Sequence, residues 1–221
     1  MMKLRPTLQR LSKNTVGQDF VVGDIHGKVA QLKQQLADAN FNPATDRLIC
    51  TGDLIDRGED SPAALALLDE PWFYSVLGNH EYLMLSGLKY GNSRDRLTWL
   101  NQGGNWIASA PRERWQHWFQ LLEALPLGIE LEGKDGRRYG IVHADYPHAE
   151  WAEFEYLTPD MMQRCIWSRS PFEQRAQHTV NGIDLLIHGH NVTGGEEVVL
   201  GNRCYIEPGA YSGNPFILKA V

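Results

Sequence analysis

The sequence predicts an α/β protein with a layered core, and two features of the chain support this fold class. Short apolar runs alternate three times with helical patterns over residues 19–88. From residue 129 onward, apolar runs instead flank hairpin-type turns. Alternating strands and helices are typical of a parallel sheet covered by helices, whereas hairpins indicate antiparallel pairing. Because open α/β sheets bind ligands beyond the carboxyl ends of their strands, we expect the functional residues there.

The first half of the chain contains three units, each made of a strand, a polar turn and a helix. The strands are expected at residues 19–22, 48–51 and 73–77. The helices are expected at residues 28–40, 63–68 and 82–88. Val29, Leu32 and Leu36 recur at helical spacing and mark the buried face of the first helix. Ser61 and Pro62 are expected as the N-cap and first residue of the second helix.

The second half predicts a helical insert and then a second sheet. Helices are expected at residues 94–102 and 112–125, separated by two glycines, so the insert covers about residues 92–125. Its stripe of Trp115, Trp118 and Phe119 favours a packed face over a substrate groove. The C-terminal half is expected to form a mostly antiparallel sheet from strands at residues 129–131, 139–142, 197–200, 204–207 and 216–218. We expect one domain over residues 1–221.

Composition excludes several classes of protein. The formal charge of -6 argues against a general binder of nucleic acid or acidic membranes, although a bound metal pair would still make one pocket positive. The three cysteines are scattered and odd in number, which favours a reducing compartment over a disulfide framework. The N-terminus lacks the apolar region of a secretory signal, and no run reaches the roughly 18 apolar residues of a membrane span. We therefore expect a cytoplasmic protein without nucleic-acid or membrane partners; the sequence specifies no oligomeric state.

Five apolar runs end in polar clusters, and these clusters predict a site with two metal ions. Each cluster carries carboxylate, amide or imidazole side chains, which are oxygen and nitrogen ligands. Such a set suits Mn²⁺, Fe or Zn²⁺ better than Mg²⁺ or a thiolate-seeking ion, and Mn²⁺ is the expected occupant. In the predicted arrangement one ion is bound by Asp24 and His26, the other by Asn79, His143 and His190, and Asp53 bridges both.

The ligand charges indicate the reaction. Two carboxylates against two dications leave a net positive site, which attracts an anionic phosphoester and allows a bridging hydroxide to form near neutral pH. Two ions about 3.5 to 4 Å apart can also stabilise both the attacking and the leaving oxygen of a displacement at phosphorus. The pattern therefore predicts metal-dependent phosphoester hydrolysis.

Three motifs closely resemble the signature motifs of the phosphoprotein phosphatase family of metallophosphoesterases. They are Gly-Asp-Ile-His-Gly at residues 23–27, Gly-Asp-Leu-Ile-Asp-Arg-Gly at 52–58 and Gly-Asn-His-Glu at 78–81. Pro-Trp-Phe at 71–73, His-Ala-Asp-Tyr-Pro at 143–147 and Ile-Trp-Ser-Arg at 166–169 are similar to the bacterial and lambda-phage branch. Two motifs depart from the family pattern at the outer wall of the pocket, namely Gly-His-Asn-Val at 189–192 and Ile-Glu-Pro-Gly at 206–209.

This resemblance implies a fold, an activity and a role for individual residues. The fold is a four-layer α/β/β/α sandwich with two central mixed sheets, and the activity is that of a serine/threonine protein phosphatase acting on phosphoproteins or phosphopeptides, with phosphotyrosine as a further substrate. Similarity gives the six predicted ligands to the metals and assigns Arg57 and Arg169, together with Asn79, to the phosphate. It assigns leaving-group protonation to His80, oriented by Asp56. Arginine forks and an imidazolium paired with a carboxylate suit these roles physically.

Two other functions remain open, and residue spacing alone does not decide whether His188 or His190 is the metal ligand. A symmetrical diadenosine-tetraphosphate hydrolase shares the first three motifs, and a pseudoenzyme could bind phosphoprotein without turnover, although intact Asp56, Arg57 and His80 argue against it. His188 and His190 end the same apolar run, and side chains at i and i+2 share a face of a strand. We expect Gly189 to turn the chain sharply and direct His190 into the site.

Overall fold

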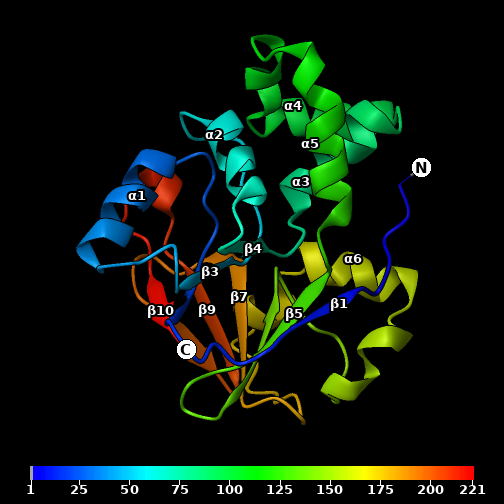
Figure 1. Ribbon diagram of the computed structural model, residues 1–221. Coiled ribbons are helices and arrows are strands. Elements are labelled where there is room, and N and C mark those ends of the chain that lie inside the picture. Colours follow the sequence, from blue (N-terminus) through cyan, green and yellow to red (C-terminus); the bar gives the residue numbers. More distant parts are fainter. Residues whose placement is uncertain (1) are drawn as a thin grey trace.

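The first sheet places three strand ends beside one another. The computed structural model describes residues 2–221, and this sheet has the order β10-β2-β3-β4 (Figure 1). Its strands are β2 (Asp19–Val22), β3 (Arg47–Cys50), β4 (Phe73–Ser75) and β10 (Leu218–Ala220). β2, β3 and β4 run parallel, and β10 pairs antiparallel with β2. The final strand, expected in the second sheet, therefore belongs to the first.

The second sheet has six strands in the order β1-β5-β6-β7-β9-β8. They are β1 (Leu8–Leu11), β5 (Gly128–Glu132), β6 (Arg138–Val142), β7 (Leu185–Val192), β8 (Val198–Leu200) and β9 (Arg203–Glu207). Both expected hairpins, β5–β6 and β8–β9, are antiparallel. The pairs β1–β5, β6–β7 and β7–β9 are parallel, so the expectation of a mostly antiparallel sheet was wrong. The long connection between β6 and β7 can return the chain in the same direction, and β1 adds an unexpected strand from the N-terminal arm.

Helices follow the strands of the first sheet and later fill the segment over residues 92–125. The helices are α1 (Val29–Asp38), α2 (Ser61–Ala66), α3 (Asn79–Met84), α4 (Ser93–Asn101), α5 (Arg112–Ala124), α6 (Pro159–Trp167) and α7 (Ser170–Glu173). Short 3-10 helices occur at η1 (Leu67–Asp69), η3 (Gly104–Ala108), η4 (Trp151–Tyr156) and η5 (Ala210–Ser212), and a π-helical segment occurs at η2 (Leu85–Lys89). None of the helices within residues 2–221 has the length and apolarity of a membrane span.

One predicted helix cap was wrong. The side chain of Asp60, not of Ser61, accepts the hydrogen bond from the backbone N–H of Ala63 at the start of α2. Ser61 is instead buried, and its hydroxyl oxygen accepts a 2.8 Å hydrogen bond from the backbone N–H of Asp56. Ser61 therefore stabilises the turn that carries the predicted site residues Asp56 and Arg57.

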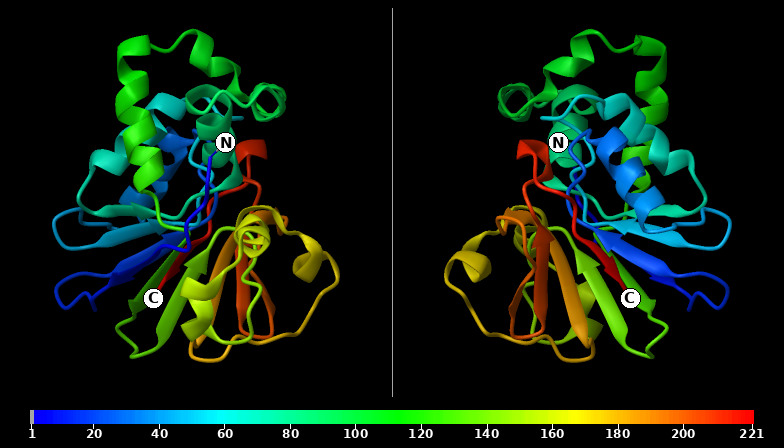
Figure 2. Two further views of the ribbon diagram at one scale, coloured as in Figure 1. Left: turned by 90° about the vertical axis from the view of Figure 1, so that its right-hand side faces the viewer. Right: turned by 90° about the vertical axis from the view of Figure 1, so that its left-hand side faces the viewer.

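Figure 2 shows the two sheets and the helices outside them as four layers, and three apolar cores lie between these layers. Val21 and Ile49 of the first sheet meet Ile141 and Ile187 of the second in the central core. The neighbouring Val22 points to the opposite face, into the core beneath α1–α5. The core on the outer side of the second sheet is covered by η4 and α6. Because side chains alternate across each strand, both sheets are covered on both faces and the four-layer arrangement follows.

Candidate active site

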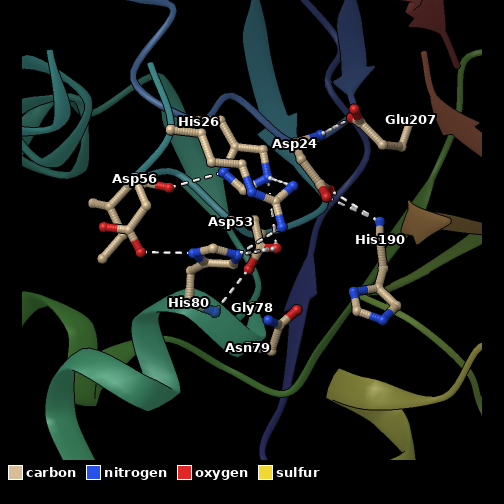
Figure 3. A network of polar contacts seen from close by, with 12 residues as sticks. Asp24, His26, Asp53, Asp56, Gly78, Asn79, His80, His190 and Glu207 are labelled. Atoms are coloured by element: carbon tan, nitrogen blue, oxygen red, sulfur yellow. Dashed lines mark hydrogen bonds and ion pairs between the residues drawn. The ribbon is translucent and has the colours of Figure 1, made fainter. Parts of the chain in front are cut away.

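The predicted site residues meet where strands of both sheets end (Figure 3). Asp53, which follows β3, lies at the centre. Its Oδ2 lies 3.9 Å from Nε2 of His26, on the turn that follows β2, and 3.9 Å from Nε2 of His80, in the first turn of α3. On the other side it lies 3.5 Å from Nε2 of His143, which follows β6 of the second sheet. The five segments that the sequence predicted to converge do so around this carboxylate.

Asp53 is held as a charged, fixed acceptor. Burial would raise the pKa of this carboxyl, but His143 and His80 outweigh it, and the pKa lies well below its ordinary value. The other carboxylate oxygen, Oδ1, accepts a 3.0 Å hydrogen bond from the backbone N–H of His80. One oxygen therefore anchors the start of α3, while the other faces the histidines.

The histidines are oriented in the way that metal ligands require. His26 Nδ1 and His143 Nδ1 each lie 2.8 Å from a backbone carbonyl oxygen, of Ile55 and Thr51 respectively. His190 Nε2 lies 3.2 Å from the carbonyl oxygen of Trp167. A ring nitrogen that donates to a carbonyl leaves the other nitrogen with a free lone pair, and such donors orient metal-binding histidines. The three rings thus fit a pair of divalent cations.

The charges of these rings fit the same interpretation. Burial lowers the pKa of His26 to about 3 and that of His190 to about 2, so both rings are neutral. For His143, burial is outweighed by the carboxylates of Asp53 and Asp24, which raise the pKa to about 9. Neutral imidazoles are the ligand form, and a cation at His143 would displace its proton.

The possible ligands form two sets that share Asp53. His26, Asp53 and His80 form one set, and Asp53, His143 and His190 form the other, with ligand atoms within 4.8 Å of one another in each. The carboxamide Oδ1 of Asn79 lies 3.0 Å from His143 Nε2, beside the second set. A shared carboxylate between two histidine groups is the arrangement that the sequence predicted for Asp53.

Asp24 lies outside both sets. Its carboxylate accepts hydrogen bonds of 3.1 Å from the backbone N–H of His190 and from the hydroxyl of Thr51. Oδ1 of Asp24 also lies 3.9 Å from Nδ1 of His143. The sequence predicted that Asp24 would share one ion with His26; the structure instead places its carboxylate against residues of the second set, and His80 stands beside His26.

His80 and Asp56 form a buried pair. His80 Nδ1 lies 2.6 Å from Asp56 Oδ2, and both side chains are fully buried. Burial alone would lower the pKa of His80, but Asp53 and Asp56 outweigh it and the pKa is raised above its ordinary value. With Nδ1 turned to Asp56, Nε2 is the nitrogen that faces the site. The pair can therefore hold a proton where a leaving group would need one.

Two arginines border the histidines. Arg57 Nη1 lies 3.0 Å from His26 Nε2, and Nη2 lies 3.1 Å from His80 Nε2. Its guanidinium also stacks 4.6 Å from the ring centre of Tyr211. Within residues 2–221 no carboxylate pairs with Arg57, and Asp56 binds His80 instead. Arg169 lies on the other side, where its Nη1 donates a 2.8 Å hydrogen bond to the carbonyl oxygen of His190.

Left-handed backbone is concentrated in this site. Seven non-glycine residues of the described chain have a positive φ, and five of them are predicted site residues. These five are His26 (45°), Asp53 (50°), Asp56 (73°), Arg57 (65°) and His190 (59°). Such conformations are costly for residues with a Cβ and cluster at functional sites. The side chains therefore project from turns that the surrounding structure must hold in place.

The role expected for Gly189 was wrong in its mechanism. The chain does turn here, with a register shift between β7 and β9 after His188, but the left-handed residue is His190 itself. A Cβ on Gly189 would lie 2.1 Å from Asp24 Oδ1 and 2.3 Å from Thr51 Oγ1. The glycine is required because Asp24 approaches the backbone too closely for any side chain.

Glu81 is a site residue that the sequence prediction missed. It is fully buried, and its carboxylate accepts hydrogen bonds from four backbone N–H groups, those of Asp53 (2.9 Å), Leu54 (2.8 Å), Ile55 (3.3 Å) and Gly78 (3.1 Å). The signal was present, because glutamate at the third position of a helix that begins at Asn79 is a capping-box residue. Glu81 thus ties the turn that carries Asp53 to the start of α3.

Replacing Glu81 by alanine is expected to destabilise the fold by at least about 3 kcal/mol, because four buried N–H groups lose their acceptor. For a chain of this size that corresponds to a fall in Tm of roughly 6 to 12 °C, which differential scanning calorimetry measures. Glu81→Gln is the intermediate variant: glutamine keeps one acceptor oxygen but places an NH2 donor where the other oxygen accepts, so Tm is expected to fall by less than in the alanine variant. Equal Tm values for the alanine variant and the parent would contradict the bracing role.

Glu207 corrects the expectation for the outer wall. This residue of the departing 206–209 motif is buried, and its carboxylate accepts 2.8 Å hydrogen bonds from the backbone N–H groups of Asp24 and Gly209. Burial raises its pKa to about 7. Glu207 therefore lies directly behind Asp24, inside the site and away from its outer wall.

Comparison with known proteins agrees with this geometry. The pattern of the calcineurin-like phosphoesterase family matches residues 20–194. Serine/threonine-protein phosphatase 2 of Salmonella typhimurium is 37% identical over 207 residues, covering 90% of this chain and 91% of that protein. A symmetrical bis(5'-nucleosyl)-tetraphosphatase of Methylococcus capsulatus is 35% identical over 136 residues, covering 61% of this chain and 45% of that protein.

Solved structures support the fold. The crystal structure of a protein proposed to be a diadenosine tetraphosphatase has a TM-score of 0.67 and 20% identity, covering 97% of both chains. At this identity the likeness concerns the fold alone, and it agrees with the two mixed sheets and their helices. The family pattern and the similarity over nearly the whole chain decide the class: the chain belongs to the calcineurin-like phosphoesterases and is a hydrolase related to bacterial serine/threonine phosphatases.

Proposed function

We propose that this hydrolase removes phosphate from phosphoserine and phosphothreonine in proteins, with phosphotyrosine as a further substrate. One observation carries the proposal: the buried His80–Asp56 pair turns Nε2 of His80 toward the same space as Arg57 and the histidines around Asp53. A proton donor, an anion-binding arginine and a metal-binding group on one site are what hydrolysis of a phosphate ester from an alkoxide leaving group needs.

Two divalent ions, with Mn²⁺ proposed as the occupant, would supply an activated water and polarise the phosphate oxygens when bound. The donor set of carboxylate, carboxamide and imidazole suits that ion or Fe and Zn²⁺. The carbonyl-bound tautomers of the histidines leave their free nitrogens directed at Asp53, which is the fit that a cation pair requires. The residues proposed to hold the ions are Asp24, His26, Asp53, Asn79, His143 and His190.

The arginines are proposed to bind the phosphate. Here Arg57 donates toward two imidazole nitrogens, and phosphate oxygens are stronger acceptors that match both arms of the fork. Substrate would therefore take Arg57 away from His26 and His80 and leave both Nε2 atoms free. Arg169, from the side of His190, is proposed to bind a second phosphate oxygen, and the carboxamide of Asn79 contributes a further polar contact.

His80 is proposed to protonate the departing oxygen. Asp56 accepts from Nδ1 and stabilises the imidazolium, so the proton available to the substrate sits on Nε2. An alkoxide from serine or threonine is a poor leaving group, so a positioned acid has its largest effect on such esters. The acid is therefore suited to phosphoserine and phosphothreonine, whose alkoxides do not leave unprotonated, whereas activated esters do not need it.

A substrate panel separates the proposal from its rivals. Metal-replete protein is assayed on phosphoserine, phosphothreonine and phosphotyrosine peptides and on diadenosine tetraphosphate. We expect kcat/KM to be at least about tenfold higher for the phosphoserine and phosphothreonine peptides than for the dinucleotide, because a relative that covers 90% of this chain is a serine/threonine-protein phosphatase. Higher kcat/KM for the dinucleotide would favour the tetraphosphatase, whose relative from Methylococcus capsulatus matches 61% of this chain. A metal-replete protein that turns over none of these substrates would be the pseudoenzyme.

Removal of metal is expected to abolish turnover of every substrate, and added Mn²⁺ is expected to restore it. Without cations the site has neither its activated water nor its phosphate clamp, and the side chains alone cannot replace them. Elemental analysis of chelated and reconstituted protein gives the metal content beside each rate. Full activity in protein shown to be metal-free would contradict the two-ion proposal.

A further inference from the structure

Two tryptophans of the helical segment 92–125 reach the catalytic pair. Trp99 of α4 donates from Nε1 to Asp56 Oδ2 over 2.8 Å, and Trp106 of η3 donates from Nε1 to Asp56 Oδ1 over 2.7 Å. The sequence prediction concerned only the stripe of Trp115, Trp118 and Phe119 in this segment and made no assignment for Trp99 or Trp106. Figure 3 shows Asp56 between its neighbours, with one oxygen turned to His80. The Asp56 carboxylate, which orients His80, is therefore itself oriented by two residues that lie outside the signature motifs.

The segment is pressed against the turn that carries Asp56. Gly103, between α4 and η3, has a φ of 114°, and a Cβ there would lie 2.7 Å from the backbone N of Arg57. A Cβ on Gly104 would lie 2.5 Å from the ring of Trp99. These two glycines allow the backbone to approach the left-handed turn closely enough for both indoles to reach one carboxylate.

The hydrogen bonds are divided between the two oxygens. Oδ2 faces His80 and accepts from Trp99, whereas Trp106 is the donor to Oδ1 among residues 2–221. A buried carboxylate with an unsatisfied oxygen is costly, so each indole fixes the rotation of the group. Trp106 is only partly buried, and its indole N–H is nevertheless directed inward to Asp56. If the two indoles served only to fill space, their N–H groups would not need to donate to the two oxygens of one carboxylate.

We propose that Trp99 and Trp106 are positioning residues for proton donation. Their N–H groups lock the carboxylate of Asp56 in the orientation that holds His80 Nδ1 and aims Nε2 at the leaving oxygen. The helical segment 92–125 therefore contributes to hydrolysis and does more than cover the sheet. This proposal rests on the proposed function through the acid role of His80.

The test compares two substrates with different needs for a proton. The leaving group of 4-nitrophenyl phosphate departs without protonation, whereas the alkoxide of a phosphoserine peptide does not. Trp106→Phe is expected to lower kcat for the peptide by about tenfold and kcat for 4-nitrophenyl phosphate by about twofold or less. KM and metal content, read by elemental analysis, are expected to stay unchanged.

Two further variants separate the hydrogen bond from the ring. Benzothienylalanine at position 106 replaces the indole N–H by sulfur while keeping the bicyclic shape, and it is expected to reproduce the selective loss. Trp118→Phe is the matched control, because Trp118 packs edge-on against Trp106 at 5.7 Å between ring centres but belongs to the packed face of α5. It is expected to change kcat for both substrates by less than about twofold.

Several outcomes would overturn the inference. Equal losses on the two substrates, or none, in Trp106→Phe and in the benzothienylalanine variant would reduce the tryptophans to packing residues. The same selective loss in Trp118→Phe would assign the effect to general repacking. His80→Asn separates the acid role of His80 from the positioning role of the tryptophans. If His80→Asn loses more kcat on the peptide than on 4-nitrophenyl phosphate but the variants at position 106 do not, the positioning role alone is overturned. If His80→Asn loses the same factor of kcat on both substrates, the acid role of His80 is wrong, and the positioning role that depends on it is wrong as well.

Discussion

Replacement of His80 by asparagine is expected to lower kcat for a phosphoserine peptide by roughly 10² to 10⁴, the usual contribution of a positioned general acid. The imidazole is fully buried, its Nδ1 lies 2.6 Å from Asp56 Oδ2, and its pKa is raised by the neighbouring carboxylates despite its burial. Asparagine keeps a polar group of similar reach but carries no transferable proton. The loss is expected to be much smaller for 4-nitrophenyl phosphate, and kcat at saturating metal for both substrates measures the difference.

Metal content decides between the two roles that His80 can have. Its Nε2 lies 3.9 Å from Asp53 Oδ2, in one set with His26, so the geometry also permits a metal ligand here. We expect His80→Asn to keep both ions. Asp56→Asn serves as the companion variant: it removes the charge behind His80 without touching Nε2, so it should also keep the metal and lose rate on the peptide. Loss of one ion in His80→Asn would make this histidine a ligand.

His190→Ala is expected to remove one ion and nearly all turnover. Nε2 of His190 is bound by the carbonyl of Trp167, so Nδ1 is the nitrogen left for a cation, and the ring lies in one set with Asp53 and His143. Loss of one of a small number of ligands weakens metal binding, and loss of the ion removes the activated water. Elemental analysis of the purified variant and kcat with added Mn²⁺ test the two parts separately.

His188→Ala is the matched control from the same strand. His188 is fully buried, burial lowers its pKa to about 3, and its Nδ1 lies 2.8 Å from the carbonyl oxygen of Val142, next to His143. It therefore supports a ligand without being directed at Asp53. We expect both ions to stay bound and activity to change by less than about tenfold, as for a residue that orients a ligand. An ion lost in His188→Ala but retained in His190→Ala would reverse the assignment.

The sequence predicted the site better than it predicted the sheets. Asp53 and His143 lie more than eighty positions apart, yet both could be placed together because each follows an apolar run that ends in a polar residue. The hairpin around residues 134–136 was also predictable, since its turn chemistry is local. By contrast, β1 pairs with β5 from the far end of the helical segment, and its sequence Leu-Gln-Arg-Leu carries no strong strand pattern.

The missed contacts share a physical cause. Trp99 and Trp106 reach Asp56 only because two glycines let the backbone approach, and nothing in the local sequence states what an indole N–H will meet. Gly189 was predicted to turn the chain sharply, whereas its lack of a side chain allows the close approach of Asp24. Tertiary contacts of this kind depend on the complete fold, so they follow from structure and not from motif spacing.

The left-handed turns of the site limit how it could be transplanted. A protein engineer who copied the six proposed ligands onto another scaffold would reproduce the side chains but not the positive φ angles of His26, Asp53 and His190. At about 1 to 2 kcal/mol for each such residue, the recipient must supply compensating contacts before the ligands can point inward. In this chain, Glu81 and Glu207 hold the neighbouring backbone N–H groups. The smallest portable unit is therefore the set of turns together with these two buried glutamates.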